Sequence, residues 1–196
     1  MLRGALIQGG LRRGAAVLLA CLLLCTPVAG LADEGPAFRV LWADVHQVEG
    51  VYQLDARIDY RLEANLREAL HNGVRLTFDM RVEITRDRNW LWDETVAGLT
   101  QGYRLQYHAL SRLYLLTHLN TGVQRTFHRL EAALTAMGDV EALPLLDAAL
   151  LETGTDYRVH LRTALRVDAL PLPLRLRGYL IPDWKPESDR YAWPLD

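Results

Sequence analysis

In residues 74–86, apolar and polar side chains alternate without a break. The apolar set is Leu76, Phe78, Met80, Val82 and Ile84, and the polar set is Arg75, Thr77, Asp79, Arg81, Glu83 and Thr85. Successive side chains of a strand point to opposite faces, so this pattern predicts a strand with one buried face and one solvated face. A chain organised around such a strand is expected to form an antiparallel sheet that buries one side.

A hairpin is predicted before this strand. Residues 38–47 and 51–62 are expected to pair through a tight turn at Glu49 and Gly50. The second of these stretches alternates as residues 74–86 do. The first is apolar on both sides, which predicts a strand covered on both faces and favours a second layer over part of the sheet.

Residues 103–109 and 113–119 predict another hairpin. A three-residue loop at 110–112 would set Ala109 opposite Leu113 and keep the apolar sets of both strands on one side of the sheet. The inward residues of the second strand are then Leu113, Leu115, Thr117 and Leu119.

Two short helices are predicted from stretches with a helical period, residues 62–72 and 126–138. Gly73 is expected to end the first helix and Gly138 the second, and Thr126 is the expected N-cap of the second. The inner face of the second helix is expected to carry Phe127, Leu130, Ala133, Leu134 and Met137.

Three stretches lack a clear period. Residues 87–102 are interpreted as a loop or an irregular turn of helix, and residues 182–196 as a tail running over the surface. Residues 143–151 are apolar but contain Pro144, which disfavours a regular element, so a short packed segment is expected there.

The last predicted strand, residues 157–167, is expected to pair with residues 172–180. That register sets Arg162 directly opposite Arg177, an unfavourable arrangement unless negative charge lies between them. The solvated face of this ribbon also carries Arg158 and Arg175. Two sources of negative charge are considered: an anionic partner bound by the guanidinium groups, or a neighbouring strand, which is favoured. The acids of that strand would be Asp55, Asp59, Asp79 or Glu83.

These elements together predict an α+β fold. We expect a twisted antiparallel sheet of about six or seven strands, which could fold over into a partial sandwich, with two short helices on its apolar face. No repeat or linker marks a second domain, so residues 33–196 are expected to form a single globular domain.

The first 32 residues are interpreted as a signal peptide. Three arginines precede an apolar run, and small residues at Gly30 and Ala32 favour cleavage after Ala32 and export to the periplasm. The alternative is an uncleaved inner-membrane anchor over residues 14–32. Acylation at Cys21 is disfavoured because the apolar run before it is very short. Membrane contact is otherwise not expected.

Composition argues against several kinds of chemistry. Removal of the leader would leave 19 basic and 24 acidic residues, a formal charge of −5, so nucleic acid is not an expected partner. Both cysteines lie in the leader, neither serine of the domain is in a nucleophile elbow, and no phosphate-binding glycine loop occurs. The histidine spacing, with His108 predicted opposite Tyr114 and His118 opposite Arg104, does not indicate a metal site. No cofactor is expected.

Trp90 and Trp92 lie in a charged stretch of the predicted loop. Such tryptophans can bind a sugar ring, a peptide or a membrane interface, but packing over the open end of the core is the favoured interpretation.

Essentially the whole of the expected mature chain resembles a family of exported Gram-negative bacterial proteins that carries a domain-of-unknown-function label. The resemblance rests on Leu170-Pro171-Leu172-Pro173-Leu174-Arg175, followed by Trp184, Ser188 and Trp193-Pro194-Leu195, and on Tyr52-Gln53-Leu54-Asp55-Ala56 and Tyr103-Arg104 earlier in the chain. Glu63-Ala64 departs from the pattern, where a serine is expected to cap the first helix, so that cap is expected to be weak. The resemblance implies no activity, cofactor or substrate.

We therefore expect a non-catalytic periplasmic binding or accessory domain that recognises an envelope protein or an anionic envelope component. The candidate binding residues are Arg158, Arg162, Arg175, Arg177, Trp90 and Trp92. The alternative is an envelope hydrolase or transferase that uses surface carboxylates such as Asp55 with Asp59, or Asp93 with Glu94. An enzyme would show a deep pocket with buried titratable groups, whereas a binding domain would show a shallow groove or patch.

Overall fold

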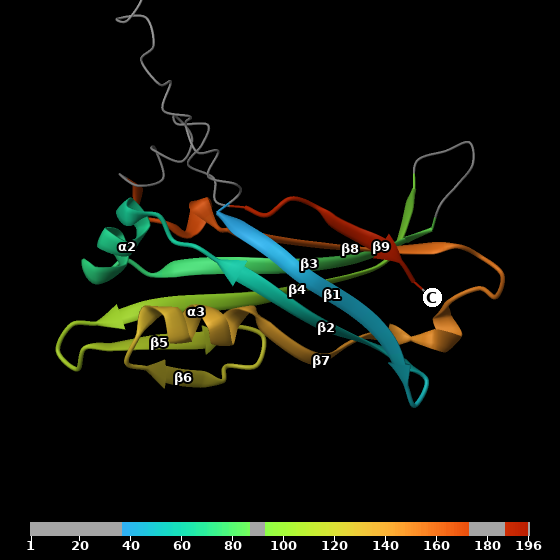
Figure 1. Ribbon diagram of the computed structural model, residues 1–196, viewed down its shortest axis with the longest axis horizontal. Coiled ribbons are helices and arrows are strands. Elements are labelled where there is room, and N and C mark those ends of the chain that lie inside the picture. The colour runs from blue at the N-terminus through green and yellow to red at the C-terminus, as the bar shows by residue number, and fades with distance from the viewer. Residues whose placement is uncertain (1–36, 87–92, 173–186, 196) are drawn as a thin grey trace, which may run out of the picture. The chain divides into compact units, whose positions relative to one another are not determined.

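The computed structural model describes residues 37–86, 93–172 and 187–195 (Figure 1). Its strands are β1 (Phe38–Val48), β2 (Val51–Tyr60), β3 (Leu76–Arg86), β4 (Glu94–His108), β5 (Leu113–His118), β6 (Gln124–Phe127), β7 (Asp139–Asp147), β8 (Tyr157–Leu165) and β9 (Tyr191–Pro194). Its helices are α2 (Ala64–His71) and α3 (Leu130–Gly138), with short 3-10 turns η1 (Ala148–Leu150) and η2 (Val167–Ala169).

The described strands form two antiparallel sheets. The smaller sheet has the order β1-β2-β7 and the larger has the order β6-β5-β4-β3-β8-β9. In Figure 1 the smaller sheet lies across the larger one, and α3 lies beside β2 and over β5. The predicted α+β class, an antiparallel sheet with two short helices, is confirmed, and the nine described strands exceed the predicted number because β6, β7 and β9 are not predicted from the sequence.

The core lies between the two sheets and is centred on β3. Phe78 is fully buried, and its ring centroid lies 5.7 Å from that of Phe38 and 5.8 Å from that of Tyr60, both from the smaller sheet. The Tyr60 hydroxyl oxygen lies 2.8 Å from Thr163 Oγ1 of β8, and burial raises the pKa of Tyr60. Buried aromatic side chains of this size contribute strongly to stability, so this contact joins the two sheets.

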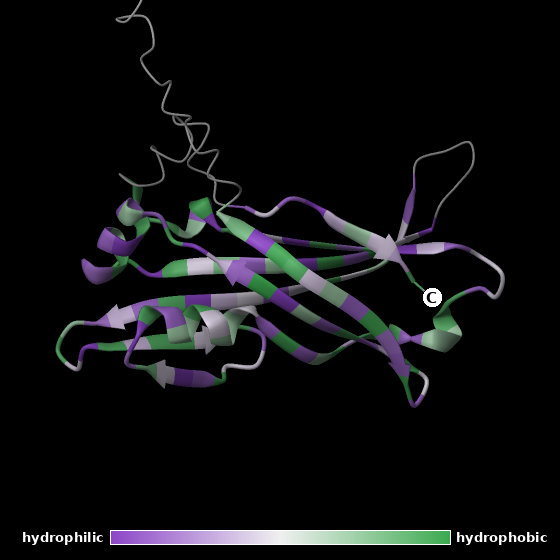
Figure 2. Ribbon diagram, in the orientation of Figure 1, coloured by the Kyte–Doolittle hydropathy of each residue, from purple (hydrophilic) through white to green (hydrophobic). Residues whose placement is uncertain are grey.

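Hydropathy alternates along the strands as predicted (Figure 2). Phe78, Met80, Val82 and Ile84 of β3 are buried, which confirms the predicted inward set. Thr77 and Thr85, predicted on the solvated face, are also nearly buried, at 5% and 3% exposure. The outer face of the larger sheet is therefore covered at these two positions.

The first hairpin forms with its predicted two-residue turn. Glu49 and Gly50 have φ angles of 50° and 85°, as a turn of type I′ requires. The prediction that the first strand is covered on both faces is wrong, because β1 is an edge strand and Leu41 and Trp42 are 48% and 45% exposed. A β-bulge between Val40 and Trp42 interrupts the alternation, so an apolar run on both sides arises there without a second cover.

The second hairpin has a different register from the predicted one. Leu113 pairs with His108 rather than Ala109, so four residues connect β4 and β5, and Arg112 takes a φ of 53°. A shift of one residue turns every side chain of a strand to its other face. The buried residues of β5 are consequently Tyr114 and Leu116, and the inward set predicted from sequence, Leu113, Leu115, Thr117 and Leu119, is wrong.

Two segments predicted to be irregular are strands. Residues 94–102, placed in a loop from sequence, are the first part of β4 and pair with β3. Residues 143–151, expected to be a packed segment, contain much of β7, which pairs with β2. Pro144 is tolerated because β7 is an edge strand, where a missing N–H costs no ladder bond on the open side.

The helices are formed but their beginnings differ from the prediction. Thr126 lies in β6, and the N-cap of α3 is Arg129, which makes no side-chain capping bond. Leu130, Ala133, Leu134 and Met137 are buried, as predicted for the inner face of this helix. The expected weak cap of α2 is confirmed, because Glu63 makes no side-chain capping bond.

The predicted pairing of the last strand is wrong. Between residues 157 and 165, β8 pairs with β3 on one side and with β9 on the other. Ser188 occupies the position next to Thr163, since its N–H donates to Thr163 O at 2.8 Å and its Oγ accepts from Thr163 N at 3.1 Å. Ser188, one of the residues on which the family resemblance rests, therefore has a structural role.

Candidate functional site

A hollow of about 490 Å³ lies where α2 leads into β3. Its lining includes Arg75, Thr77 and Arg104, together with Leu170 and Pro171. We call it the Arg75–Arg104 hollow. Its volume is within the range of small-molecule sites, about 300–1,000 Å³.

The end of α2 positions the first arginine of the hollow. Gly73 has a φ of 85°, and two hydrogen bonds close the last turn, from Gly73 N to Leu70 O and from Val74 N to Ala69 O, each 3.0 Å. Glycine reaches this left-handed conformation at no steric cost, and this is the usual end of a helix. The chain is thereby directed into β3 with Arg75 just before its first residue.

The second arginine of the hollow comes from the middle of the larger sheet. Arg104 of β4 pairs with Thr77 of β3 on one side and with Thr117 of β5 on the other. No acidic residue is therefore directly opposite it. Among the residues that the structure describes, neither Arg75 nor Arg104 has a carboxylate within 4 Å. The hollow thus has two guanidinium groups without an ionic partner in the described part of the chain.

The predicted arginine ribbon is found only in part. Arg158 and Arg162 lie on the outer face of β8, and Arg162 is directly opposite Arg81 of β3 instead of Arg177. Arg175, Arg177, Trp90 and Trp92 lie outside the described residues.

Acids from neighbouring segments accompany several arginines of this face. Arg162 Nη2 lies 2.8 Å from Glu187 Oε2, and Arg190 Nη2 lies 3.8 Å from Glu83 Oε2. Arg166 is 3.6 Å from Asp79. Of the four acids proposed from sequence, Asp79 and Glu83 lie beside arginines of this face, which are Arg166 and Arg190.

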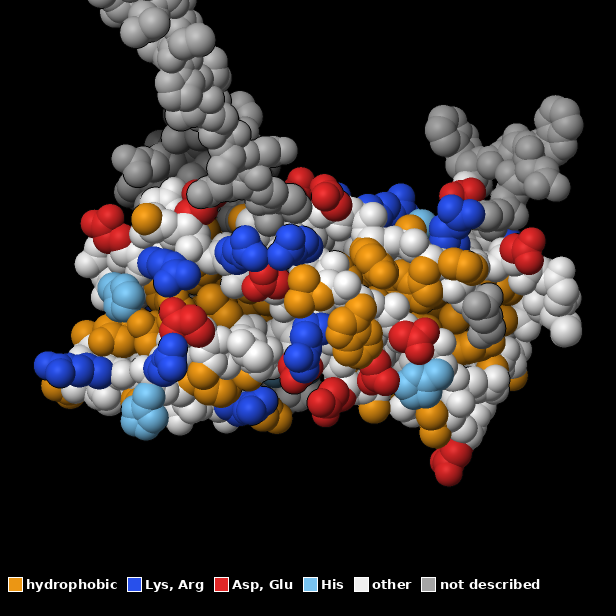
Figure 3. All heavy atoms as spheres, in the orientation of Figure 1, with side chains coloured by type: hydrophobic (Ala, Val, Ile, Leu, Met, Phe, Trp, Pro, Cys, Tyr) orange, Lys and Arg blue, Asp and Glu red, His pale blue; other side chains and the backbone are white. Residues whose placement is uncertain are grey.

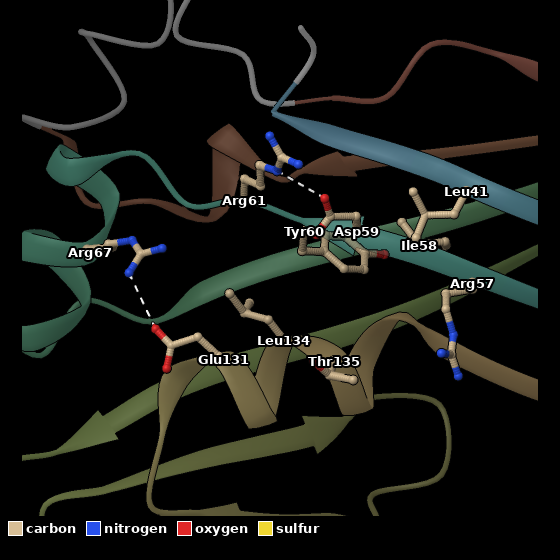
Figure 4. Close-up of a pocket in the computed structure, with 10 residues that line it drawn as sticks. All are labelled: Leu41, Arg57, Ile58, Asp59, Tyr60, Arg61, Arg67, Glu131, Leu134 and Thr135. Carbon is tan, nitrogen blue, oxygen red and sulfur yellow. Dashed lines mark hydrogen bonds and ion pairs between the residues drawn. The ribbon is translucent and has the colours of Figure 1, made fainter. Parts of the chain in front are cut away.

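A second hollow, of about 300 Å³, lies between the end of β2 and α3, and we call it the α3 groove (Figure 4). Ile58, Tyr60 and Leu134 contribute apolar surface to it. Figure 3 shows basic and acidic side chains next to one another on this face of the molecule. The groove therefore differs from the Arg75–Arg104 hollow in the charges that surround it.

Each arginine of the α3 groove has an acidic partner. Arg57 Nη2 lies 2.8 Å from Asp139 Oδ1, and Arg61 Nε lies 2.9 Å from Asp59 Oδ2. Arg67 points from α2 toward Glu131 of α3, at 3.6 Å (Figure 4). The positive charge of this groove is consequently compensated within the chain.

Three of the four acids that the enzymatic alternative names, Asp55, Asp59 and Glu94, have structural partners. Asp59 accompanies both Arg39 and Arg61, and Asp55 Oδ1 accepts a hydrogen bond of 2.7 Å from Ala142 N. Glu94 pairs with Arg86 and raises the pKa of that guanidinium. Within the described ranges, these carboxylates maintain the connections between strands.

The histidines are dispersed among aromatic and hydroxyl partners. His71 Nε2 lies 2.8 Å from Tyr114 Oη, and His118 Nε2 lies 2.8 Å from Gln101 Oε1. His118 pairs with Tyr103, not with Arg104 as predicted, and burial lowers its pKa. No group of three or more histidine, cysteine, aspartate or glutamate residues in the described part of the chain could hold a metal ion.

His160 is the most enclosed titratable group on the outer face of the larger sheet. It is 8% exposed, its Nε2 lies 2.9 Å from Thr85 Oγ1, and its Nδ1 is buried without a hydrogen-bond partner among the described residues. Burial lowers the pKa of His160, and the nearby Arg190 and Arg158 lower it further. Glu83 and Asp93 act in the opposite direction, so burial is the main reason for the lowered pKa.

The sequence shows both arginines of the Arg75–Arg104 hollow, but it does not distinguish them from the other outward-facing arginines of the strands. Both arginines belong to the predicted outward sets of their strands, as do Arg158 and Arg162. Only the pairing of β4 with β3 and β5 shows that threonines, rather than acids, lie beside Arg104. The register of three strands was needed to separate the arginines with acidic partners from those without.

The family whose model matches the chain is described as a domain of unknown function, DUF4390, and the match spans residues 36–194. No curated protein and no solved structure matches the chain. No helix in the described ranges is long and apolar enough to cross a membrane.

Proposed function

We propose that this protein, which belongs to the DUF4390 family of domains of unknown function, is a non-catalytic binding domain of the cell envelope that holds a phosphate-bearing group in the Arg75–Arg104 hollow. The observation that carries this proposal is the pair of arginines without acidic partners, among the described residues, at a hollow of about 490 Å³. A guanidinium group can donate two parallel hydrogen bonds to a phosphate or carboxylate, and such charge-assisted bonds are roughly twice as strong as neutral ones.

The hollow has further features that suit an anion. Thr77, which pairs with Arg104 across β3 and β4 and is nearly buried, also lines the hollow and places no acid beside the arginines. Pro171, which is exposed, also lines the hollow and adds apolar surface to it. A ligand with an anionic head and a less polar body would contact both the arginines and this proline.

A role without catalysis is supported by the use of the described carboxylates. Asp55 and Asp59 are engaged with a backbone N–H and with arginines, respectively. A general acid or base has to exchange a proton with a substrate, and a carboxylate held in an ion pair is poorly suited to that. Hydrolysis or group transfer by surface carboxylates is the second candidate, and it predicts turnover.

The envelope location is part of the same proposal. The arginines, the apolar run and the small residues before Asp33 favour export with cleavage after Ala32. Mass spectrometry of the protein purified from cells should then find an N-terminus at or within a few residues of Asp33. An intact Met1 would instead favour the alternative, an anchor over residues 14–32.

The binding proposal is tested with a soluble and a membrane-bound source of the same group. Glycerol phosphate is titrated into the purified protein by NMR, and sedimentation is measured with phosphatidylglycerol vesicles and with neutral phosphatidylcholine vesicles. Binding is expected to weaken with added salt, because screening shortens the range of exposed charges. Binding of both phosphate sources assigns the phosphate group itself, and binding of the anionic vesicles alone assigns a lipid surface.

Two double variants locate the site. Arg75→Glu with Arg104→Glu should abolish binding, whereas Arg57→Gln with Arg67→Gln, in the α3 groove, should leave it unchanged. Equal loss in both variants, or no binding of either phosphate source by the wild type, would overturn the proposal. Turnover of a phosphodiester or glycoside probe that is lost with the acids of the α3 groove would favour the enzymatic candidate.

A further inference from the structure

The edge strand of the smaller sheet, β1, leaves one side open. Within the described residues β1 pairs only with β2. An open strand edge presents unpaired N–H and C=O groups and is a template for pairing with another chain. Proteins usually protect such edges with charges, prolines or bulges.

The protection of β1 is confined to its first part. The β-bulge lies between Val40 and Trp42, and Phe38, Arg39 and Val40 share a small pocket with residues 189–191. Residues 42–48 pair with β2 without a further register shift. This regular segment of β1 is the part that can accept another strand.

The hairpin geometry fixes which residues face the open side. In a two-residue hairpin, the residues next to the turn, here Val48 and Val51, form a hydrogen-bonded pair, and bonded and non-bonded pairs then alternate. Ala43, Val45 and Gln47 therefore direct their N–H and C=O groups away from β2. These groups have no strand partner among the described residues.

The side chains on the outer face of this segment match a second copy of the same segment. Trp42 and Val48 are 45% and 39% exposed, and Asp44 and His46 between them are also exposed. In an antiparallel pair with Val45 on the two-fold axis, Trp42 would lie opposite Val48 of the second copy, and Asp44 opposite His46 of the second copy. In this register each apolar side chain meets an apolar one, and each ionisable side chain meets one of opposite type. Figure 3 shows hydrophobic side chains on this face of the molecule.

The charges within one chain favour the same pairing. Asp44 lies directly opposite Asp55 of β2, an unfavourable pair of like charges. Asp55 is accompanied by His46, whose Nδ1 lies 3.5 Å away, whereas Asp44 has no basic side chain within 4 Å in the described ranges. A second copy would bring an imidazole next to Asp44.

We propose that the protein forms a two-fold symmetric dimer through residues 42–48 of β1, with Val45 on the axis. The two three-stranded sheets then join into one sheet of six strands, with the order β7-β2-β1 continued by β1-β2-β7 of the second copy. Ala43, Val45 and Gln47 supply the hydrogen bonds between copies, and Trp42 with Val48 supplies the apolar contact. The inference is independent of the phosphate-binding proposal.

Sedimentation equilibrium of the purified protein tests this pairing. The wild type is expected to dimerise, and Gln47→Pro should weaken the dimer at least about tenfold, because proline removes an N–H that faces the partner strand and none that faces β2. Gln47→Ala keeps that N–H and should dimerise as the wild type does. A monomeric wild type, or an unchanged dimer in Gln47→Pro, would overturn the proposal.

If circular dichroism shows that Gln47→Pro does not fold, a second variant, Asp44→Lys, tests the dimer instead. Asp44→Lys should weaken the dimer, because a cation would then lie opposite His46 of the second copy. The same change should raise the stability of the monomer, because the introduced ammonium group would face Asp55 where an acid does now. Dimerisation of Asp44→Lys with wild-type affinity would contradict the register centred on Val45.

Discussion

The α3 groove and the Arg75–Arg104 hollow are both rich in arginine but differ in how that charge is compensated. Arg57, Arg61 and Arg67 of the groove each have a carboxylate within 4 Å. Neither arginine of the hollow has one among the described residues. The number of arginines is therefore a poor guide to a binding site, because many arginines of this chain connect its own strands and helices.

The difference follows from where each arginine lies in the fold. The arginines of the groove lie at junctions between the small sheet and the helices, where acids of other elements approach them. Those of the hollow lie on or next to the larger sheet, where Arg104 has threonines on both neighbouring strands. Exposed ion pairs contribute little to stability, typically about 0–1 kcal/mol, but they do remove charge that could bind a ligand. An arginine without a carboxylate partner keeps its positive charge available for a ligand.

The largest expected effect concerns the contact between the end of α3 and Ile58 of β2, a residue that lines the α3 groove. A Cβ atom at Gly138 would lie 2.0 Å from Ile58 O, so Gly138→Ala forces α3 away from β2. We expect a loss of about 3 kcal/mol in the free energy of unfolding, measured by urea denaturation. Gly98→Ala is the control, since a Cβ there meets nothing within 4 Å. Equal stability of the two variants would mean that the groove is not closed by this contact.

The next effect concerns the hollow. Arg75→Glu with Arg104→Glu should weaken binding of phosphatidylglycerol vesicles or glycerol phosphate by at least about 100-fold, since two attractive charges become repulsive. Its unfolding free energy should stay within about 0.5 kcal/mol of the wild type, because neither arginine holds an ion pair with a described residue. A large loss of stability would show that these arginines have structural partners and would remove the contrast with the groove.

A smaller effect on stability should distinguish an arginine that has a carboxylate partner from one that has none among the described residues. Arg57→Gln removes the ion pair with Asp139, in which Arg57 is 50% exposed, and should cost about 0.5 kcal/mol. Arg75→Gln removes no ion pair among the described residues and should leave the urea midpoint unchanged. The comparison fails if Arg75→Gln is the more destabilising of the two.

The smallest effect is a pH dependence from the outer face of the larger sheet. His160 has a lowered pKa, caused first by burial and then by Arg190 and Arg158, with Glu83 and Asp93 acting in the opposite direction. The unfolded chain therefore takes up this proton first, near a pH of about 6.5. The contribution of His160 to stability is present above that pH and is lost as the pH falls.

His160→Gln should reduce this loss of stability, measured as the shift of the urea midpoint between neutral and mildly acidic solution. His108→Gln, at an exposed position, is the control. Glu83→Gln removes negative charge near His160 and should lower the pKa of this histidine further, as followed by NMR titration. An unaltered pH dependence in His160→Gln would show that folding does not lower the pKa of His160.

Much of the fold could be predicted because one face of most strands is buried. The alternation in residues 74–86, 51–62 and 157–167 predicted β3, β2 and β8, and the Glu49-Gly50 turn fixed the first hairpin. Predictions failed where the local hydrophobic pattern does not reveal how a strand pairs with its neighbours. The four-residue connection before β5 shifted its register, and Pro144 obscured a strand that only an edge position allows.

The candidate site was less predictable than the fold, since it depends on neighbours distant in the sequence. The arginine ribbon assumed that residues 157–167 pair with the segment that follows them. In the structure β8 pairs with β3 and β9, so Arg162 lies opposite Arg81 and next to Glu187. No local pattern distinguishes these pairings, because an outward arginine is exposed in either.

The sequence by itself determined which apolar side chains of β2, β3 and β8 are buried, because period-two alternation follows from strand geometry alone. It also determined the class of fold and the abundance of guanidinium groups on the polar faces. Only the tertiary structure decided which arginines retain their charge for a ligand and which edge remains open. Both properties depend on the partner that a strand meets across the sheet, and that choice is made by packing between residues far apart in the chain.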